Sequence, residues 1–256
     1  MLKQQWISLK TIVRVEIIRF LRVWIQSLMP PVITIVLYFL VFGHFIGSRI
    51  QMSDNVTYMQ FIVPGLVMMA VVNSAYGNVV SSFFGAKFQR NIEEMLVSPM
   101  EEWVIVAGYV AAGIVRGIVV GFLVFLISCF FTHPSVYHLG IIILFTILTS
   151  AVFSLAALIN GIFARNFDEV AIFQNFVLVP LIYLGGVFYS IAKLPVVWQD
   201  LSKLNPLLYM VDGFRYGFFG FSDVSVTFSA GLLIVLTLIL WQINIWLLKK
   251  GIGIKN

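Results

Sequence analysis

The chain has 256 residues, of which 61% are hydrophobic and 11% are charged. Apolar segments long enough to cross a bilayer, about 20 residues each, fill most of this length and exclude a soluble domain of appreciable size. The net charge of +5 does not indicate nucleic-acid binding, because the basic residues flank the apolar segments, where they set membrane topology.

Residues 1–22 have the pattern of an amphipathic helix. Apolar side chains recur every three or four positions from Leu2 to Phe20. Arg14 borders this stripe, whereas Glu16 and Arg19 point to other faces. We therefore expect an interfacial helix whose basic groups lie near anionic lipid headgroups. Five basic residues against one acidic residue in this stretch also predict a cytoplasmic N-terminus.

Six apolar segments are each long enough to cross a membrane as a helix. They are predicted at about residues 23–46, 58–82, 104–131, 138–164, 170–189 and 227–248. In this topology eleven basic residues lie on the cytoplasmic side and four, including Arg49 and Lys193, lie outside. This imbalance satisfies the positive-inside rule and places both termini in the cytoplasm. We expect one transmembrane domain covering residues 1–256.

The densest cluster of charge lies between the second and third spans, at residues 83–103. Its apolar residues stand four apart, at Phe84, Phe88, Ile92 and Leu96, and its charged residues include Lys87, Arg90, Glu93 and Glu94. This spacing predicts an amphipathic helix ending near Ser98, where Ser98 as N-cap and Glu101 as capping-box partner begin the next span. Such a helix is suited to take force from a soluble partner, although a solvated loop remains the alternative.

A few polar residues lie inside the spans. Ser74 and Asn78 share one face of the second span and predict helix packing or a pathway lining. Arg116, in the third span, is expected either to be functional or to have a structural role, in which it snorkels to the membrane surface or pairs with a C-terminal carbonyl of another helix. Asn175 lies in the fifth span, beside Gln174. We expect this span to be bent, because it contains these polar residues and Pro180.

Small residues recur on one helical face in two spans and predict close helix packing. They are Gly113, Gly117 and Gly121 in the third span, and Thr146, Ser150, Ser154, Ala157 and Gly161 in the fourth.

Residues 191–226 are too apolar for a free loop and too interrupted by Pro and Gly for a span. Pro195 is predicted to open one short helix. Asn205 as N-cap and Pro206 at the first helical position open a second, which runs to about Phe219. We expect these helices to dip into the membrane from outside and return.

The sequence contains no motif that supplies energy. It has no phosphate-binding loop of the form G-x-x-x-x-G-K-[ST], and its three histidines have no neighbouring ligands at metal-binding spacing. Asp, Glu and Lys are absent from the span interiors, so no proton relay is evident. We expect no catalytic residue, and no cofactor or metal bound by this chain.

Four stretches resemble the ABC-2 type transporter permeases, and among them the YadH-like inner-membrane group. They are SSFFGAKFQRNIEEMLVSP at 81–99, YMQFIVPGL at 58–66, YLGGVFY at 183–189 and KLNPLLYMVDGFRYGFF at 203–219. The resemblance covers essentially the whole chain. It implies an all-α membrane protein with six transmembrane helices, an N-terminal interfacial helix, a cytoplasmic coupling helix and re-entrant outer helices, known as the ABC-2 or type V exporter fold.

The resemblance also implies partners. The chain would form a homodimer in the bacterial inner membrane, bind two copies of an ATP-binding-cassette ATPase that carries ATP and Mg, and export its substrate. The residues that match the family's ATPase-coupling interface are Arg14, Glu16, Arg19, Phe84, Lys87, Phe88, Arg90, Glu93, Glu94, Arg165 and Asp168. The outer loops are short and no glycan-binding domain is present, which favours a hydrophobic or amphipathic substrate.

Two other functions remain open on the sequence. An ion-coupled secondary carrier would use Arg116 as its intramembrane charge, but the spans offer that residue no acidic partner. The second alternative function is that of a scaffold, which assembles partners in the membrane without transporting a substrate.

Overall fold

The computed structural model describes residues 2–46, 51–53, 56–191 and 194–253. Its elements are α1 (Leu2–Arg22), α2 (Trp24–Tyr38), η1 (Phe39–Ile46), β1 (Gln51–Ser53), β2 (Val56–Thr57), α3 (Tyr58–Phe88), α4 (Asn91–Val97), α5 (Glu102–Phe131), α6 (Leu139–Phe163), α7 (Phe167–Phe173), η3 (Gln174–Leu178), α8 (Val179–Leu184), α9 (Val196–Lys203), α10 (Pro206–Phe219) and α11 (Val226–Lys250). The two short strands pair antiparallel. Arg49, Asp54 and Lys193 lie outside the described residues.

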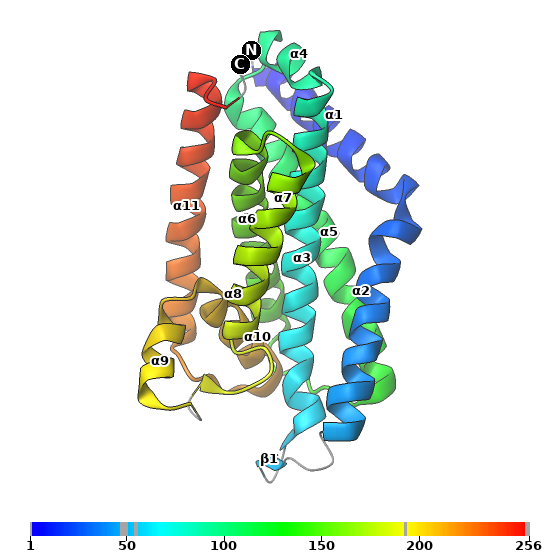
Figure 1. The fold of residues 1–256 in the computed structure, drawn as a ribbon, viewed down its shortest axis with the longest axis vertical. Helices are drawn as coiled ribbons and strands as arrows, with labels where there is room; N and C mark the ends of the chain where they lie inside the picture. Colours follow the sequence, from blue (N-terminus) through cyan, green and yellow to red (C-terminus); the bar gives the residue numbers. More distant parts are fainter. Residues whose placement is uncertain (1, 47–50, 54–55, 192–193, 254–256) are drawn as a thin grey trace.

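Six helical segments of the described chain are long and apolar enough to cross a membrane, as predicted. They are Trp24–Phe42, Tyr58–Phe88, Glu102–Phe131, Leu139–Phe163, Phe167–Leu184 and Val226–Lys250. Figure 1 shows them as a bundle with both chain termini at one end, beside α4, and with β1 at the other. We call these the α4 end and the β1 end.

Helix α3 forms the centre of the bundle. It begins at Tyr58 with a capping box, in which Gln60 N–H donates to the Thr57 side chain and the Gln60 side chain accepts from Thr57 N–H. The most apolar stretch of α3 is 78% buried, against 17% for α2, 11% for the fifth segment and 22% for α11. Helices α5 and α6 pack on α3, whereas α2, α7–α8 and α11 leave apolar faces uncovered in the single chain.

Close helix packing occurs where the small residues predict it. A Cβ atom on Gly113 would collide with Ser154 Oγ, and one on Gly117 with Ser150 Oγ. Helices α5 and α6 therefore approach each other through the two small-residue faces, which is the usual means of helix association in lipid.

The fifth segment is not a continuous α-helix, because a π-helical turn interrupts it at the place where a bend was expected. Residues Gln174–Leu178 form this turn between α7 and α8, and Pro180 follows it at the start of α8. The helix ends at Leu184, and Gly186 turns the chain with φ +74°. The segment is thus shorter than the predicted 170–189.

The charged segment after α3 differs from the single amphipathic helix that we expected. Helix α3 continues to Phe88, the chain turns at Arg90 in the left-handed conformation (φ 62°), and α4 follows. The predicted capping box at Ser98 is wrong, because Ser98 ends α4 and Glu101 precedes α5 without a side-chain cap. Nothing in the sequence indicates the break, since no glycine stands at the turn.

A first testable prediction concerns Gly65, where α3 meets the turn after α8. A Cβ atom there would lie 2.9 Å from Val187 Cα and closer still to its carbonyl oxygen. Because backbone atoms cannot move aside as a side chain can, Gly65→Ala should cost about 1–3 kcal/mol of stability. Gly77→Ala is the control, since no heavy atom lies within 4 Å of its added methyl group. Equal melting temperatures for the two purified variants would contradict this packing.

Candidate functional site

The α4 end carries a continuous surface formed by elements that are far apart in the sequence. We define the α4-end surface by the side chains of Phe84, Phe88, Arg90, Glu93, Glu94, Arg165 and Asp168. All but Phe84 are exposed. Two apolar side chains at this end are also exposed, Phe88 at the end of α3 by 64% and Val97 at the end of α4 by 87%.

An aromatic cluster joins the two predicted cytoplasmic elements of this surface. The Phe167 ring lies edge-on to Phe84 at 4.8 Å between centroids and 5.3 Å from Phe88. The end of α3 and the start of α7 therefore form one unit, although 79 positions separate Phe88 from Phe167.

Lys87 strengthens the same junction. Its ammonium group donates to the carbonyl oxygens of Gly161, Ile162 and Ala164, at the C-terminal end of α6. A cation is favourable there because the last carbonyls of a helix have no intrahelical donor. Lys87, one of the predicted interface residues, thus makes its hydrogen bonds within the chain and holds α3 to the end of α6.

The 165–169 segment is ordered by its own side chains. Asn166 caps α7 by accepting from Glu169 N–H at 2.8 Å, and the Glu169 carboxylate accepts from Arg165 N–H at 2.9 Å. Arg165 and Asp168 are left exposed at the first turn of α7.

Helix α1 is attached to this end by Gln5. The Gln5 side chain donates to Pro99 O and accepts from Glu101 N–H, each at 3.1 Å. Further along α1, Ile12 packs on Gly108 of α5, where a Cβ atom would lie 2.5 Å from Ile12 Cγ2. The N-terminal helix is therefore held against α5.

The expected orientation of Glu16 is wrong. Glu16 is only 6% exposed and lies on the buried face of α1 with Gln5, Ile12 and Phe20. Its carboxylate accepts from Ser82 Oγ at 2.6 Å and from Arg19 Nη2 at 3.0 Å. The burial is tolerated because both carboxylate oxygens have donors. Glu16 is thus unavailable to a partner on this surface, whereas Arg14 is exposed.

Arg19, Asn78 and Arg116 form a cluster inside the bundle, which we call the arginine cluster. Arg19 Nη2 and Arg116 Nη1 both donate to Asn78 Oδ1, at 2.9 Å and 3.1 Å. Arg116 Nη2 also lies 3.5 Å from Ser27 O. That carbonyl has no helical donor because Pro31 occupies the fourth position beyond it. Arg116 thus approaches a backbone carbonyl of another helix, but this carbonyl lies in the first turn of α2 and not at a helix C-terminus as in the structural alternative.

A polar pocket of about 350 Å³ adjoins the arginine cluster. It is lined by side chains of α1, α2, α3, α5 and η3, among them Arg19, Ser74, Gly77, Arg116 and Gln174. Asn175 lies outside it and is exposed, whereas its neighbour Gln174 contributes to the lining. Of the four residues predicted for a pathway or packing, the structure brings Ser74, Asn78 and Arg116 together.

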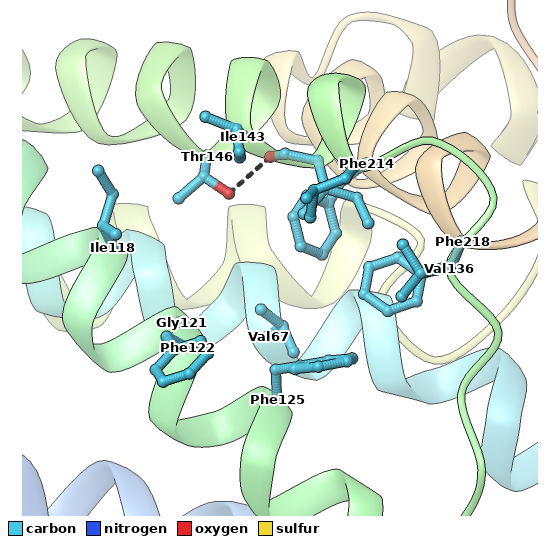
Figure 2. A pocket seen from close by; sticks show the side chains of 12 residues that line it. Val67, Ile118, Gly121, Phe122, Phe125, Val136, Ile143, Thr146, Phe214 and Phe218 are labelled. Atoms are coloured by element: carbon cyan, nitrogen blue, oxygen red, sulfur yellow. Dashed lines mark hydrogen bonds between the residues drawn. The ribbon is translucent and has the colours of Figure 1, made fainter.

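A second pocket, also about 350 Å³, is almost wholly apolar. Figure 2 shows Phe122 and Phe125 from α5 facing Phe214 and Phe218 from α10, with Thr146 of α6 turned to its own backbone. Sequence reasoning did not locate this pocket, because its walls come from four helices.

Sequence reasoning also missed a buried ion pair in α10. Asp212 is 1% exposed and Arg215 is 3% exposed, with 3.9 Å between Asp212 Oδ1 and Arg215 Nη1. Asp212 accepts from the N–H groups of Asp223 and Val224, and Arg215 donates to Gly186 O. Burial raises the pKa of the Asp212 carboxyl, while these donors and Arg215 act to lower it.

The predicted N-cap of α10 is confirmed. Asn205 Oδ1 accepts from Leu207 N–H at 3.0 Å, Pro206 is the first helical residue, and Gly220 ends the helix in the left-handed conformation. The pattern Asp-x-x-Arg inside α10 signals an ion pair, but nothing in it distinguishes a buried pair from an exposed one.

Comparison with known proteins identifies relatives over the full length of the chain. The model of the family described as ABC-2 type transporter matches residues 7–219. The inner membrane transport permease YadH of Escherichia coli K12 is 52% identical over 256 residues, which is 100% of both chains. Nodulation protein J of Rhizobium leguminosarum bv. viciae is 23% identical over 220 residues, covering 84% of this chain and 83% of that protein.

Proposed function

Because the chain belongs to the ABC-2 type transporter family and is a multi-pass inner-membrane transport permease, we propose that it works as one half of an ATP-driven exporter. In this proposal two copies of the chain form a homodimer, and a separate ABC ATPase, also in two copies, binds ATP and Mg. The permease moves a hydrophobic or amphipathic substrate outward. The chain itself binds no nucleotide.

The α4-end surface carries this proposal. It presents acidic, basic and apolar side chains on α4 and around the start of α7. The aromatic cluster joins α7 to the end of α3, Lys87 joins α3 to α6, and α4 follows α3 after the turn at Arg90. A push on this surface would therefore act on α3, α6 and α7 at once, since packed helices move as rigid elements.

Helix α3 provides the route for such a movement. Its 31 residues form a single helix about 46 Å long, from the α4-end surface to the β1 end. On the way it carries Asn78 of the arginine cluster and Ser74 of the polar pocket. We propose that α4 lies in the cytoplasm with both termini, and that α9 and α10 dip into the outer side of the membrane.

The uncovered helix faces support the homodimer. Apolar side chains of α2 and of η3–α8 remain exposed, among them Ile33, Leu37, Phe176 and Tyr183. Lipid can also cover such faces, so the proposal of a homodimer rests on the family relationship and not on exposure alone.

Helices α2 and α8 are held together within the chain. Tyr38 and Tyr183 share a 2.8 Å hydrogen bond between their hydroxyl groups.

The test is to purify the detergent-solubilised chain from its native membrane and to assay what co-purifies. The expected result is a P-loop ATPase at equal stoichiometry, whose hydrolysis rate changes with added substrate. A chain recovered alone, under conditions that preserve other membrane complexes, would contradict the proposal. Transport that survives ATP depletion but collapses with the ion gradient would favour a secondary carrier.

A further inference from the structure

We propose that the polar pocket binds the anionic headgroup of a membrane amphiphile, between Arg19 and Arg116. The inference rests on the proposed function for one point only, that the bound amphiphile is the transported substrate. Binding itself is a property of this chain and is tested without an ATPase.

The charges around the pocket do not balance. Glu16 is the acid that pairs with Arg19, and its second oxygen is taken by Ser82. Among the described residues Arg116 forms no ion pair, and its other neighbours are the neutral Asn78, the Ser27 carbonyl and the Phe20 ring. A charge in this position, inside a span and without a counterion, is costly. An anion in the pocket would remove that cost.

The two guanidinium groups converge on one point. Because both donate to Asn78 Oδ1, the donor nitrogens of Arg19 and Arg116 lie within about 6 Å of each other. Like charges at such a distance repel strongly at low dielectric. On Arg19, Nε and Nη2 already donate to Glu16 and Asn78, which leaves Nη1 for a ligand. A phosphate or carboxylate group is the ligand that such a pair favours, because its oxygens accept charge-assisted hydrogen bonds from guanidinium groups.

The rest of the lining fits an anion and its polar surroundings. The pocket contains no acidic side chain among the described residues, and its polar lining residues are Gln26, Ser27, Asn73, Ser74, Ser81 and Gln174. The Ser74 hydroxyl and the Arg116 Nε atom are buried and have no hydrogen-bond partner within the described part of the chain. Buried donors are normally satisfied, so two unpaired donors beside the pocket are unusual, and a ligand reaches them only when the surrounding side chains move.

The pocket also has the size and freedom that the proposal requires. Its volume of about 350 Å³ is at the small end of the range for ligand sites and suits a headgroup. The Arg116 contact to Ser27 O is 3.5 Å long, at the outer limit of a hydrogen bond. The guanidinium can therefore turn to an anion while losing little.

The test uses Gly77, which lines the pocket and has no heavy atom within 4 Å of the position that a Cβ atom would take. Gly77→Asp places a carboxylate in the anion's place, and Gly77→Asn places a neutral group of the same size there. Purified chain in neutral detergent is titrated with phosphatidylglycerol, phosphatidylcholine or inorganic phosphate, and binding is followed by the rise in melting temperature.

The wild type and Gly77→Asn are expected to bind phosphatidylglycerol, and Gly77→Asp at least about tenfold more weakly, the effect of losing a charged hydrogen bond. Phosphatidylcholine should bind weakly to all three. If inorganic phosphate raises the melting temperature as phosphatidylglycerol does, the site recognises the free anion. If only phosphatidylglycerol raises it, the site requires the acyl chains as well. Equal binding of both lipids by the wild type, or of phosphatidylglycerol by Gly77→Asp and Gly77→Asn, overturns the proposal.

A second pair of variants guards against a folding defect at Gly77. Arg116→Gln removes the unpaired charge, and Arg22→Gln removes an exposed arginine at the end of α1. Phosphatidylglycerol binding should fall in the first and persist in the second, with both variants eluting as the wild type does on size exclusion. Equal affinity of Arg116→Gln and Arg22→Gln for phosphatidylglycerol would also contradict the proposal.

Discussion

The Asp212→Ala variant is expected to be much less stable than the wild type. Truncating Asp212 leaves Arg215, only 3% exposed, without its carboxylate, and leaves the N–H groups of Asp223 and Val224 without an acceptor. Breaking a buried ion pair from one side costs about 3–5 kcal/mol, a large part of the roughly 5–15 kcal/mol that holds a typical domain together. Melting temperature and monodispersity in detergent measure the effect.

Asp200→Ala is the matched control for this prediction. Asp200 and Lys203 form an ion pair of the same three-residue spacing, but their side chains are 67% and 55% exposed. Such a pair contributes at most about 1 kcal/mol, so its loss should leave the melting temperature almost unchanged. The double variant Asp212→Ala/Arg215→Leu should fold better than Asp212→Ala alone, because it removes the stranded charge. If Asp212→Ala has the same melting temperature as Asp200→Ala, the ion pair between Asp212 and Arg215 does not stabilise the fold.

Reversing the charges of Glu93 and Glu94 is expected to have the second large effect, a loss of ATP-driven transport. Both side chains are exposed on the first turn of α4, and on the proposed function they meet the ATPase. The double variant Glu93→Lys/Glu94→Lys should lower ATP-driven transport at least about tenfold, since charge reversal at an interface costs several kcal/mol. Lysines at a helix N-terminus cost only about 0.3–1 kcal/mol each, so the variant should still insert and fold.

Two measurements separate lost coupling from lost folding. The variant's melting temperature should stay close to the wild type, while co-purification with the ATPase or stimulation of its hydrolysis is lost. Asp200→Lys, an acid-to-lysine change at the opposite end of the molecule, should transport normally. Unchanged transport by the double variant would count heavily against a coupling role for α4.

The long apolar segments and the small residues were sufficient to predict the framework of the fold. The number of spans follows from segment length, and the packing faces that contain Gly113 and Ser154 follow from the spacing of small residues, because both properties depend on local sequence alone. That these two faces pack on each other is shown only by the structure. The same holds for Asn205 and Pro206 at the start of α10.

Features that depend on distant partners could not be predicted. Glu16 appeared to point away from the apolar stripe of its helix, but it is buried because Ser82, 66 positions later, and Arg19 satisfy it. Arg215, one of the four basic residues counted outside the membrane, is buried, and its burial depends on Asp212, Gly186 and Phe61 together. Only the assembled bundle brings such groups into contact.

The hydrogen bonds of Gln5 also constrain the order in which the protein can be assembled. Gln5 binds Pro99 and Glu101, which lie 94 and 96 positions later in the chain. At a synthesis rate of about 5–20 residues per second, α1 waits about 5–20 s for these partners. Ser82, which donates to Glu16, is made before Pro99, so the middle of α1 can contact α3 while Gln5 still lacks its partners. The N-terminal part of α1 is therefore fixed only after the whole of α3 and residues 99–101 have been made.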